Sequence, residues 1–314
     1  MNGTAAVPDA LAAARDAHAL LGAATARLRA SGSPSFRLDA ELLVAHAYAR
    51  DRAWLRAHPE AELSDDAAAN LASWLERRAE GEPIAYIRGF KEWFSLRLAT
   101  DRRALIPRPE TELLAEAAIA EVAAHLASES TLLGVCEVGT GCGAVALALA
   151  LRFRSSLALG RLRLTASDLS PDALELAAEN LAAHGVGRLV SLSCANLLEP
   201  VARPGGSVEL VVANLPYLTR AEVEAGRGSL AWEPPMALDG GVDGLGLFRD
   251  LLEGLVELPT RPAVVLLEIG AGQAGPLHRL VANALPGARV TFLPDLAGIE
   301  RVARVEVGEG GGGG

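Results

Sequence analysis

From Glu110 to Val307, short β-prone apolar segments alternate with longer segments of helical periodicity. This alternation favours a parallel sheet, because parallel strands are joined by crossover helices that cover both faces. The pattern predicts strands at Leu132–Glu137, Leu162–Ser167, Leu189–Ser193, Val208–Ala213, Ala263–Glu268, Val290–Leu293 and Val302–Val307. It predicts helices at Glu110–Ala127, Ala144–Arg154, Pro171–His184, Leu245–Glu257 and Ala274–Ala284. No helix separates the last two strands. We therefore expect an α/β fold with a seven-stranded, mostly parallel sheet and an antiparallel final strand pair.

The residues before Glu110 have a different character. The first part of the chain is predicted to be helical, and Ser64 followed by two aspartates is typical of a helix start. Tyr86–Phe90 and Leu96–Ala99 are short, aromatic and β-prone, which predicts a β-hairpin. The chain ends in a glycine run that we expect to be a flexible tail. The predicted organisation is a small all-helical domain, a hairpin linker, the α/β domain and the tail, at residues 1–80, 81–107, 108–308 and 309–314.

Charge and cysteine content narrow the class of protein. The formal net charge is −10, whereas a protein that grips nucleic acid through its phosphates usually has the opposite balance. The 3 cysteines show no C-x-x-C spacing and the 6 histidines form no motif, so neither a disulfide framework nor a metal site is expected. No apolar run reaches the ~18–20 residues that span a bilayer, and no secretory signal is visible. We expect a cytoplasmic protein that does not associate with membranes.

The loop after the first strand of the α/β domain is rich in glycine and opens the next helix. Glycine lets the backbone approach a ligand closely and adopt positive φ, and the following helix start has free N–H groups. Gly139, Gly141 and Ala144 match the G-x-G-x-x-G/A dinucleotide fingerprint. Gly139, Gly141 and Gly143 equally match the G-x-G-x-G loop of S-adenosylmethionine-dependent methyltransferases. In that second interpretation Glu137 lies at the strand end just before the loop. A plain tight turn is the third alternative.

Polar residues follow the next two strands. Asp168 ends the second strand, where a carboxylate can accept hydrogen bonds from both hydroxyls of a ribose. Both NAD and S-adenosylmethionine contain ribose, so Asp168 does not separate these two cofactors. Its structural alternative is an N-cap for the helix that begins at Pro171. Asn196 follows the third strand, where a contact with an adenine edge is expected, and its alternative is a loop turn residue.

The fourth strand runs into the tetrapeptide Asn214-Leu215-Pro216-Tyr217. In an open α/β sheet, ligands bind outside the carboxyl ends of the strands, so Asn214 is expected to face the same crevice as the glycine loop. The side-chain carbonyl of Asn214 can accept a hydrogen bond from a substrate NH₂ group, and a backbone carbonyl beside Pro216 can accept a second. Tyr217 can lie flat against a planar amide or base. The tetrapeptide therefore fits a planar NH₂ group, with an ordinary Asx-type turn as the alternative.

These segments together resemble the HemK-type (PrmC/HemK) protein-glutamine methyltransferases, which methylate the Gly-Gly-Gln glutamine of peptide chain release factors at its side-chain nitrogen. The resemblance covers nearly the whole chain. Besides the glycine loop, Asp168 and the tetrapeptide, it rests on Gly81–Ile87 with Gly89, Leu105–Glu112, Glu233-Pro234, Ala237–Gly241, Asp243–Leu245 and Asp295–Gly298. It implies a Rossmann-like methyltransferase sheet and class I peptide chain release factors as partners, with no direct contact to nucleic acid.

The resemblance also implies the cofactor and the site residues. S-adenosylmethionine is expected to be bound by Glu137, Gly139, Thr140, Gly141, Cys142, Gly143, Asp168, Asn196, Leu197 and Asn214. Asn214, Leu215, Pro216 and Tyr217 are expected to hold the glutamine, with Asn214, Pro216 and Tyr217 as the catalytic group. The glutamine nitrogen would attack the methyl group directly, with Asn214 and the backbone carbonyl at Leu215 or Pro216 fixing the NH₂ group. S-adenosylhomocysteine would be the second product.

Two positions depart from the family pattern. The family usually reads Asn-Pro-Pro-Tyr, whereas Leu215 replaces the first proline, and Asn-Leu-Pro-Tyr is similar to ribosomal RNA adenine dimethylases. Asn196 stands where the family commonly has aspartate. Three alternatives therefore stay open: an adenine N6-methyltransferase acting on ribosomal RNA or DNA, an NAD-dependent dehydrogenase, and an inactive release-factor-binding protein.

The hairpin region carries positive charge. Residues 88–108 contain six basic and two acidic residues, a net charge of +4 in an acidic chain. We expect this hairpin and the helical domain to form one wall of a cleft that docks the release factor, and opposite charge across such a rim would raise the association rate. A solvated hairpin without a partner is the alternative.

Overall fold

The computed structural model describes residues 14–128, 131–202, 208–226 and 228–308. The chain divides into two compact units, Met1–Phe90 with Arg227–Trp232, and Lys91–Gly226 with Glu233–Gly314. The division falls at Phe90, within the segment expected to be a linker, so most of the predicted hairpin belongs to the larger unit. The glycine tail expected at 309–314 lies outside the described residues.

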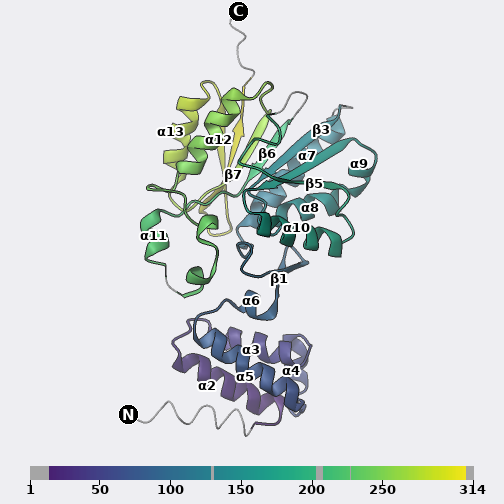
Figure 1. The fold of residues 1–314 in the computed structure, drawn as a ribbon, viewed down its shortest axis with the longest axis vertical. Coiled ribbons are helices and arrows are strands. Elements are labelled where there is room, and N and C mark those ends of the chain that lie inside the picture. The colour runs from purple at the N-terminus through teal and green to yellow at the C-terminus, as the bar shows by residue number, and fades with distance from the viewer. Residues whose placement is uncertain (1–13, 129–130, 203–207, 227, 309–314) are drawn as a thin grey trace, which may run out of the picture. The chain divides into compact units, whose positions relative to one another are not determined.

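The smaller unit is helical (Figure 1). Its helices are α2 (Ala17–Ala30), α3 (Phe36–Ala47), α4 (Arg52–Ala57), α5 (Asp65–Ala79) and α6 (Ile84–Arg88), and it also holds the 3₁₀ turn η1 (Gly228–Trp232). Asp16, Asp51 and Ser64 cap α2, α4 and α5 by accepting a hydrogen bond from the backbone N–H three residues further on. Buried leucines from α2, α3 and α5 form the core. The predicted helical region is confirmed from Ala17 onward, whereas residues 1–13 lie outside the described residues, and the predicted cap at Ser64 is confirmed.

The strand expected at Tyr86–Phe90 is wrong, because Ile84–Arg88 form the short helix α6. The carbonyl of Pro83 accepts a hydrogen bond from the Ile87 amide at 3.1 Å, which closes one helical turn. Gly89 then ends the helix in the left-handed conformation, at φ 74°. Strand β1 (Phe90–Trp93) begins only after this glycine and pairs with β2 (Leu96–Ala99), which was predicted correctly.

The larger unit is built on a seven-stranded sheet of order β5-β4-β3-β6-β7-β9-β8. Its strands are β3 (Leu133–Val138), β4 (Leu162–Asp168), β5 (Val190–Cys194), β6 (Leu210–Ala213), β7 (Val264–Glu268), β8 (Arg289–Pro294) and β9 (Glu300–Glu306). Strands β3 to β7 are parallel, and β9 runs antiparallel to both of its neighbours. The expected α/β sheet with an antiparallel final pair is confirmed.

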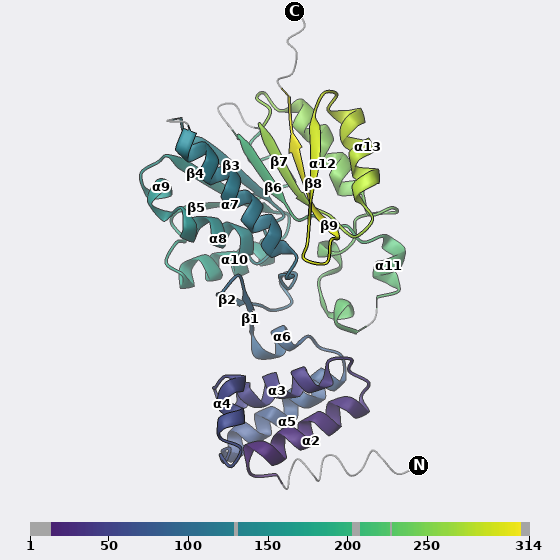
Figure 2. The same ribbon diagram turned by 180° about the vertical axis from the view of Figure 1, so that it is seen from behind.

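Helices cover both faces of this sheet (Figures 1 and 2). One face carries α7 (Thr111–Ser128), α8 (Ala144–Arg152) and α10 (Pro171–Ala183), and the other carries α12 (Gly246–Glu257) and α13 (Ala274–Ala284). Side chains alternate between the two cores along each strand, as in β6, where Leu210 and Val212 face the first and Val211 and Ala213 the second. The short helices α9 (Arg154–Ala158) and α11 (Arg220–Glu224) and the 3₁₀ turn η2 (Pro235–Ala237) were not predicted.

The strand order places a topological switch at β3. The chain passes from β3 to β4 and β5 on one side, and then returns to β6 on the other. In open α/β sheets ligands bind outside the carboxyl ends of the strands at such a point. None of the helices in the described part of the chain combines the length and apolarity that a membrane crossing requires.

Candidate active site at the carboxyl edge of the sheet

A cavity of about 370 Å³ lies at the carboxyl ends of β3, β4 and β6. Small-molecule sites usually occupy roughly 300–1,000 Å³. The structure brings together at this cavity the expected residues Glu137, Gly139, Thr140, Gly141, Cys142, Asp168, Asn196, Leu197, Asn214, Leu215 and Pro216. Two expected residues, Gly143 and Tyr217, are not among those that line it.

The glycine loop has the backbone conformation that its sequence predicts. Gly139, Gly141 and Gly143 adopt φ of 72°, 55° and 82°, which L-residues with side chains rarely adopt. The amides of Gly139 and Thr140 both donate to the Ser167 carbonyl at 2.9 Å, which ties the loop to the end of β4. A Cβ at Gly143 would lie 3.0 Å from the Cβ of Ala177 in α10. Gly143 therefore allows close packing of two helices rather than contact with the cavity.

Glu137 is a buried carboxyl group beside this loop. The Thr140 hydroxyl donates to Glu137 Oε2 at 2.8 Å. Burial raises the pKa of Glu137 to about 8, although the hydrogen bonds from Thr140 and from the Ala146 amide act in the opposite direction.

Asp168 orders the loop on the other side of the cavity. Its Oδ2 accepts a hydrogen bond from the Gly141 amide and its Oδ1 one from the Ser170 amide, both at 2.9 Å. The N-cap of α10 is Ser170, whose hydroxyl accepts from the Ala173 amide at 3.2 Å. The alternative role of Asp168 as that N-cap is therefore wrong. An ionised carboxylate has about four acceptor sites, so two remain for a ligand.

Asn196 lies both at the cavity and in a turn, and its expected contact with an adenine edge stays a prediction. It lines the cavity. It also begins a turn in which its backbone N–H donates to Glu199 Oε2 at 2.9 Å. Its carbonyl accepts from the Glu199 amide at 3.0 Å. Leu197 follows at a positive φ of 44°, so the backbone turns sharply at the cavity wall.

The first two residues of the tetrapeptide, Asn214 and Leu215, line the cavity. Asn214 Nδ2 donates to Thr111 Oγ1 at 3.1 Å, so the side-chain carbonyl of Asn214 is not turned toward Thr111. Leu215 is buried at 3% exposure. Its Cδ2 would lie 3.5 Å from a Cβ at Gly139, so the side chain that replaces the usual proline packs against the glycine loop.

Tyr217 is held on the far side of the tetrapeptide. Gln273 Nε2 donates to the Tyr217 carbonyl at 3.0 Å, and a Cβ at Gly270 would lie 3.0 Å from the tyrosine ring. Burial raises the pKa of the Tyr217 hydroxyl to about 12. The ring thus packs against the loop after β7, and its expected contact with a substrate stays a prediction.

The segment Leu105–Glu112 joins the site to its surroundings. Glu233, whose side chain is fully buried, accepts from the Ile106 amide at 3.0 Å and from Arg108 Nη2 at 2.5 Å. Glu112 Oε1 accepts from the Phe94 amide at 2.8 Å, at the tip of the β1–β2 hairpin. Arg108 and Glu112 thus tie this segment to Glu233 and to the hairpin.

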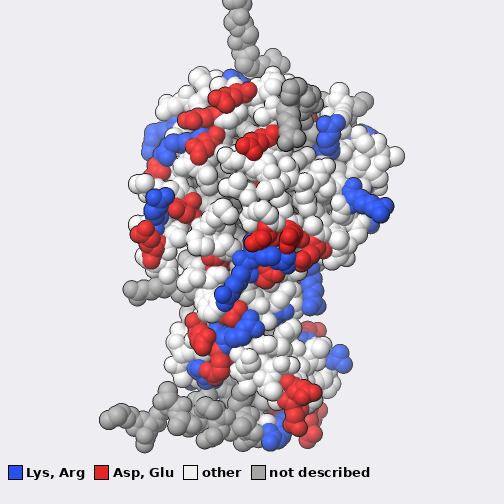
Figure 3. Space-filling view, viewed as in Figure 1, with Lys and Arg blue, Asp and Glu red and all other residues white. Residues whose placement is uncertain are grey.

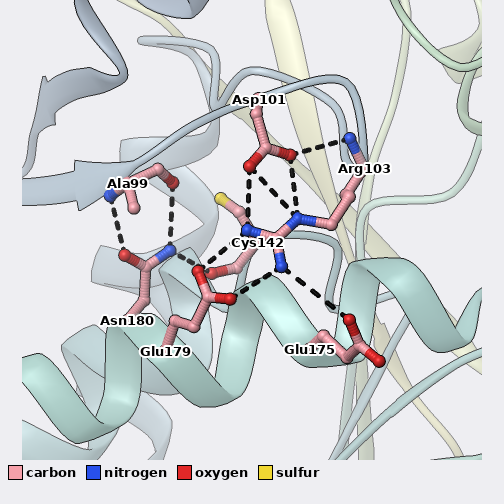
Figure 4. Close-up of polar contacts among 7 residues, drawn as sticks. All are labelled: Ala99, Asp101, Arg103, Cys142, Glu175, Glu179 and Asn180. Atoms are coloured by element: carbon pink, nitrogen blue, oxygen red, sulfur yellow. Dashed lines mark hydrogen bonds and ion pairs between the residues drawn. The ribbon is translucent and has the colours of Figure 1, made fainter.

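A polar cluster fixes the hairpin against α10 (Figure 4). Asn180 accepts from the Ala99 amide at 2.7 Å and donates to the carbonyls of Ala99 and Cys142 at 3.1 and 2.9 Å. Arg103, a cavity residue, donates to both oxygens of Glu179 and of Asp101. Hydrogen bonds to Glu179 and Asp101 hold the pKa of Arg103 above its ordinary value.

Ion pairs inside the larger unit lower the charge that the hairpin region was expected to present. The net charge of +4 counted Arg103 and Arg108 as available to a partner, whereas Glu179 and Glu233 neutralise them inside the larger unit. Arg97 and Arg102 are exposed. The prediction of a docking surface therefore rests on fewer charges than the sequence suggests.

Further cavity residues had no role in the sequence analysis. Among them are Met236 and Leu247, which follow the tetrapeptide in sequence. Thr111, at the start of α7, also lines the cavity. It lies in the Leu105–Glu112 segment on which the resemblance rests, and a polar side chain two residues after Pro109 was the available signal for its role. Within the described residues no group of three or more His, Cys, Asp or Glu side chains could hold a metal ion.

Comparison with known proteins agrees with this architecture. Residues 19–89 match the PrmC N-terminal domain family, and residues 135–229 match the methyltransferase domain family. A relative from Moorella thermoacetica, the release factor glutamine methyltransferase, is 36% identical over 283 residues, covering 90% of this chain and 95% of the relative. The relative of the same name from Cereibacter sphaeroides is 37% identical over 283 residues, with the same coverage.

A solved structure is similar in fold. The human METTL16 catalytic domain, in complex with the MAT2A 3′UTR hairpin 1, has a TM-score of 0.53 and 13% sequence identity, covering 81% of this chain and 85% of that chain. This likeness concerns the fold alone.

Proposed function

The chain belongs to the release factor glutamine methyltransferases, and from that premise we propose that it methylates class I peptide chain release factors. The methyl group passes from S-adenosylmethionine to the side-chain amide nitrogen of the glutamine in the Gly-Gly-Gln motif. The observation that carries this proposal is the setting of Asn214, whose amide nitrogen is bound to Thr111 at the wall of the cavity. Its carbonyl oxygen is thereby left to accept a hydrogen bond from a substrate NH₂ group.

The cavity residues fit S-adenosylmethionine by their chemistry. Asp168 keeps two acceptor sites for ribose hydroxyls, and Asn196 offers an amide near the expected place of an adenine edge. Leu169 and Leu197 provide apolar wall between them. When bound, this cofactor supplies an electrophilic methyl group on a sulfonium sulfur.

The chain's own residues orient the glutamine. The Asn214 side-chain carbonyl accepts one N–H of the NH₂ group, and a backbone carbonyl accepts the other. A Cβ at Gly240 would lie 2.6 Å from the Pro216 carbonyl oxygen, so that carbonyl faces the 239–244 loop. The backbone carbonyl of Asn214 similarly faces Gly139. The Leu215 carbonyl is therefore our choice for the second acceptor.

This arrangement needs no strong base. An amide nitrogen is a poor nucleophile because its lone pair is delocalised, and two acceptors favour the pyramidal form in which the lone pair is free. The nitrogen becomes acidic only as the new bond forms, so its proton is lost late. Most of the rate effect then comes from proximity and orientation, which can supply ~7–11 kcal/mol in favourable cases.

Recognition of the rest of the release factor requires a surface outside the cavity. A single glutamine cannot give selectivity, because most proteins contain glutamines. We assign docking to the helical unit and to the exposed arginines of the hairpin, Arg97 and Arg102. On the face drawn in Figure 3, basic side chains lie beside acidic ones, unlike the clustered basic face typical of nucleic-acid binding.

A labelled-methyl assay on purified substrates tests the proposed function. We expect label on an intact release factor, and none on the same factor with its Gly-Gly-Gln glutamine replaced by alanine. Ribosomal RNA and DNA serve as competing substrates. Label on adenine but not on the release factor would overturn the proposal in favour of the adenine N6-methyltransferase alternative, and tight NAD binding without methyl transfer would overturn the enzyme class.

A further inference from the structure

A buried carboxyl group that the proposed methyl transfer does not use lies at the carboxyl end of β7. Glu268 is 1% exposed. In the described structure neither of its carboxylate oxygens has a hydrogen-bond partner. A buried, unpaired carboxylate lowers the free energy of unfolding. Such a residue therefore calls for an explanation other than stability.

The sheet places Glu268 beside Asn214. Strands β6 and β7 are parallel, and their register pairs Ala213 with Leu267, so Asn214 and Glu268 are the next residues along each strand. Thr111 begins α7, which packs against both strands. Thr111 is buried at 4% exposure and accepts the hydrogen bond from Asn214 Nδ2 at 3.1 Å. Three polar side chains from three elements thus converge here: Thr111 and Asn214 line the cavity, and Glu268 is not among its lining residues.

The chemistry of these groups sets the direction of the hydrogen bonds. A threonine hydroxyl has one hydrogen, and because Thr111 Oγ1 accepts from Asn214, that hydrogen is free to go to another acceptor. Thr111 and Asn214 both lie near enough to Glu268 to lower the pKa of its carboxyl group. An ionised carboxylate only accepts hydrogen bonds. Asn214 donates to Thr111, and the hydrogens left over on both side chains have the ionised Glu268 as an acceptor within electrostatic reach, although neither forms a hydrogen bond to it in the structure.

We propose that Glu268 is a positioning residue for the methyl transfer. By attracting the donors of Thr111 and Asn214, it holds the Asn214 amide with its nitrogen toward the protein and its carbonyl oxygen toward the cavity. Without this acceptor the amide can turn over, and it would then present an NH₂ group to the NH₂ group of the substrate. The role in methylation rests on the proposed function, whereas the coupling between Glu268 and Asn214 does not.

A role for ionised Glu268 makes the methyl transfer depend on pH. Burial raises the pKa of Glu268 to about 7. Glu110 also raises this pKa, whereas Thr111, Arg301 and Asn214 lower it. Tyr217, whose own pKa is raised partly by Glu268, stays neutral in this range. The carboxylate acts as an acceptor only when ionised, so kcat should fall as the pH drops below about 7.

Kinetics of Glu268→Gln test the role in methylation. Loss of a group that orients a reacting side chain typically costs 10–100-fold in activity, so we expect kcat on the release factor to fall by about that factor. The KM and the affinity for S-adenosylmethionine should change little, and the acidic limb of the pH profile should disappear. Glu268→Asp, which keeps the carboxylate, should retain part of kcat. The matched control is Glu209→Gln at the other end of β6, where Glu209 accepts from the Gly134 amide.

A second readout does not require a substrate. The side-chain NH₂ resonances of Asn214, identified by their loss in Asn214→Ser, should titrate near pH 7 in the wild type and in Glu209→Gln but not in Glu268→Gln. If they do, and no release factor is methylated, the proposed function is wrong and the coupling stands. If the release factor is methylated but the resonances do not titrate, or kcat is unchanged in Glu268→Gln, the role of Glu268 is overturned.

Discussion

At the scale of single residues, Asp168 combines two tasks at the end of β4. Its two oxygens accept hydrogen bonds from the amides of Gly141 and Ser170, which leaves about two acceptor sites for the proposed ribose hydroxyls. The carboxylate is thus part of the loop's structure, and we propose that it is part of the ligand site as well. A measurement of cofactor affinity in variants of Asp168 distinguishes its role in the loop from its proposed role in ribose binding.

Asp168→Ala should weaken binding of S-adenosylmethionine. Two hydroxyl contacts to a charged acceptor would be lost, each worth ~1.5–3 kcal/mol, and the glycine loop would lose its anchor at Gly141. Titration calorimetry with S-adenosylmethionine measures the loss, and Asp168→Asn, which keeps the shape and an acceptor oxygen, should lose less. Unchanged affinity in Asp168→Ala would remove this residue from the site.

Leu215→Pro separates the side chain of residue 215 from its backbone carbonyl. The variant keeps the carbonyl that we assign to the substrate, so kcat should be retained. The buried leucine contacts on Gly139 are reduced, and partial loss of a buried leucine typically costs about 1–3 kcal/mol of stability. Thermal unfolding and kcat are measured together. A change of preferred substrate from protein to adenine would instead show that the side chain determines the substrate.

The positions of the site residues could be predicted where the residues follow the ends of predicted strands. Asp168 and Asn214 follow the predicted strands directly, and the carboxyl ends of neighbouring parallel strands meet at one edge. Glu268 ends a predicted strand in the same way, but the sequence does not show that its carboxyl group is buried next to Asn214. The packing of Tyr217 depends on Gly270 and Gln273, more than 50 residues away in the chain.

At the scale of elements, the 239–244 loop supports the tetrapeptide. The Gly240 amide donates to the Leu218 carbonyl at 2.8 Å, and Gln273 bonds to the carbonyls of both Tyr217 and Gly244. A Cβ at Gly240 would lie 2.6 Å from the Pro216 oxygen and 2.9 Å from the Tyr217 Cα. The loop and the tetrapeptide are therefore in contact backbone to backbone.

Gly240→Ala should move the tetrapeptide and lower kcat. The three nearest atoms that the new methyl group would meet all belong to the backbone, so the backbone itself must shift. A misplacement of about 1 Å can cost about 100-fold in rate, while cofactor affinity should change less. Gly275→Ala in α13 is the control, because its nearest neighbour is a flexible arginine tip at 3.8 Å. Equal kcat in the two variants would contradict the supporting role of this loop.

Long elements were easier to predict than short ones. All seven strands of the large sheet occur within two residues of their predicted ends, because buried apolar runs separated by helices leave few alternatives. The strand prediction for Tyr86–Phe90 was wrong because the β-prone side chains there were given more weight than Pro83 and Gly89. These two residues start and end a single helical turn. The short helices α9 and α11 contain only 5 residues each, too few for a periodic pattern.

At the scale of the whole molecule, reversing the charge of the exposed hairpin arginines tests the proposed docking surface. Arg97→Glu with Arg102→Glu should lower kcat/KM on an intact release factor by about tenfold, mainly through the association rate, and less so at high salt. A short Gly-Gly-Gln peptide should be affected little. Arg103 is left unchanged, because its reversal would break the cluster with Asp101 and Glu179.

The control for this experiment reverses two exposed arginines elsewhere in the same unit, Arg163→Glu with Arg188→Glu. It applies the same change of net charge, so a general effect of charge would lower both double variants alike. Equal loss on the peptide and on the intact factor would show that the hairpin acts on catalysis and not on docking.

In the proposed reaction Asn214 holds the glutamine NH₂ group for methyl transfer, and site-resolved mass spectrometry of the treated release factor measures whether it does. The wild type should add one methyl group, located on the side chain of the Gly-Gly-Gln glutamine. Asn214→Ala should bind S-adenosylmethionine nearly as well as the wild type but lose most of this methylation. A methyl group on any other residue, or equal methylation by Asn214→Ala, would contradict the account.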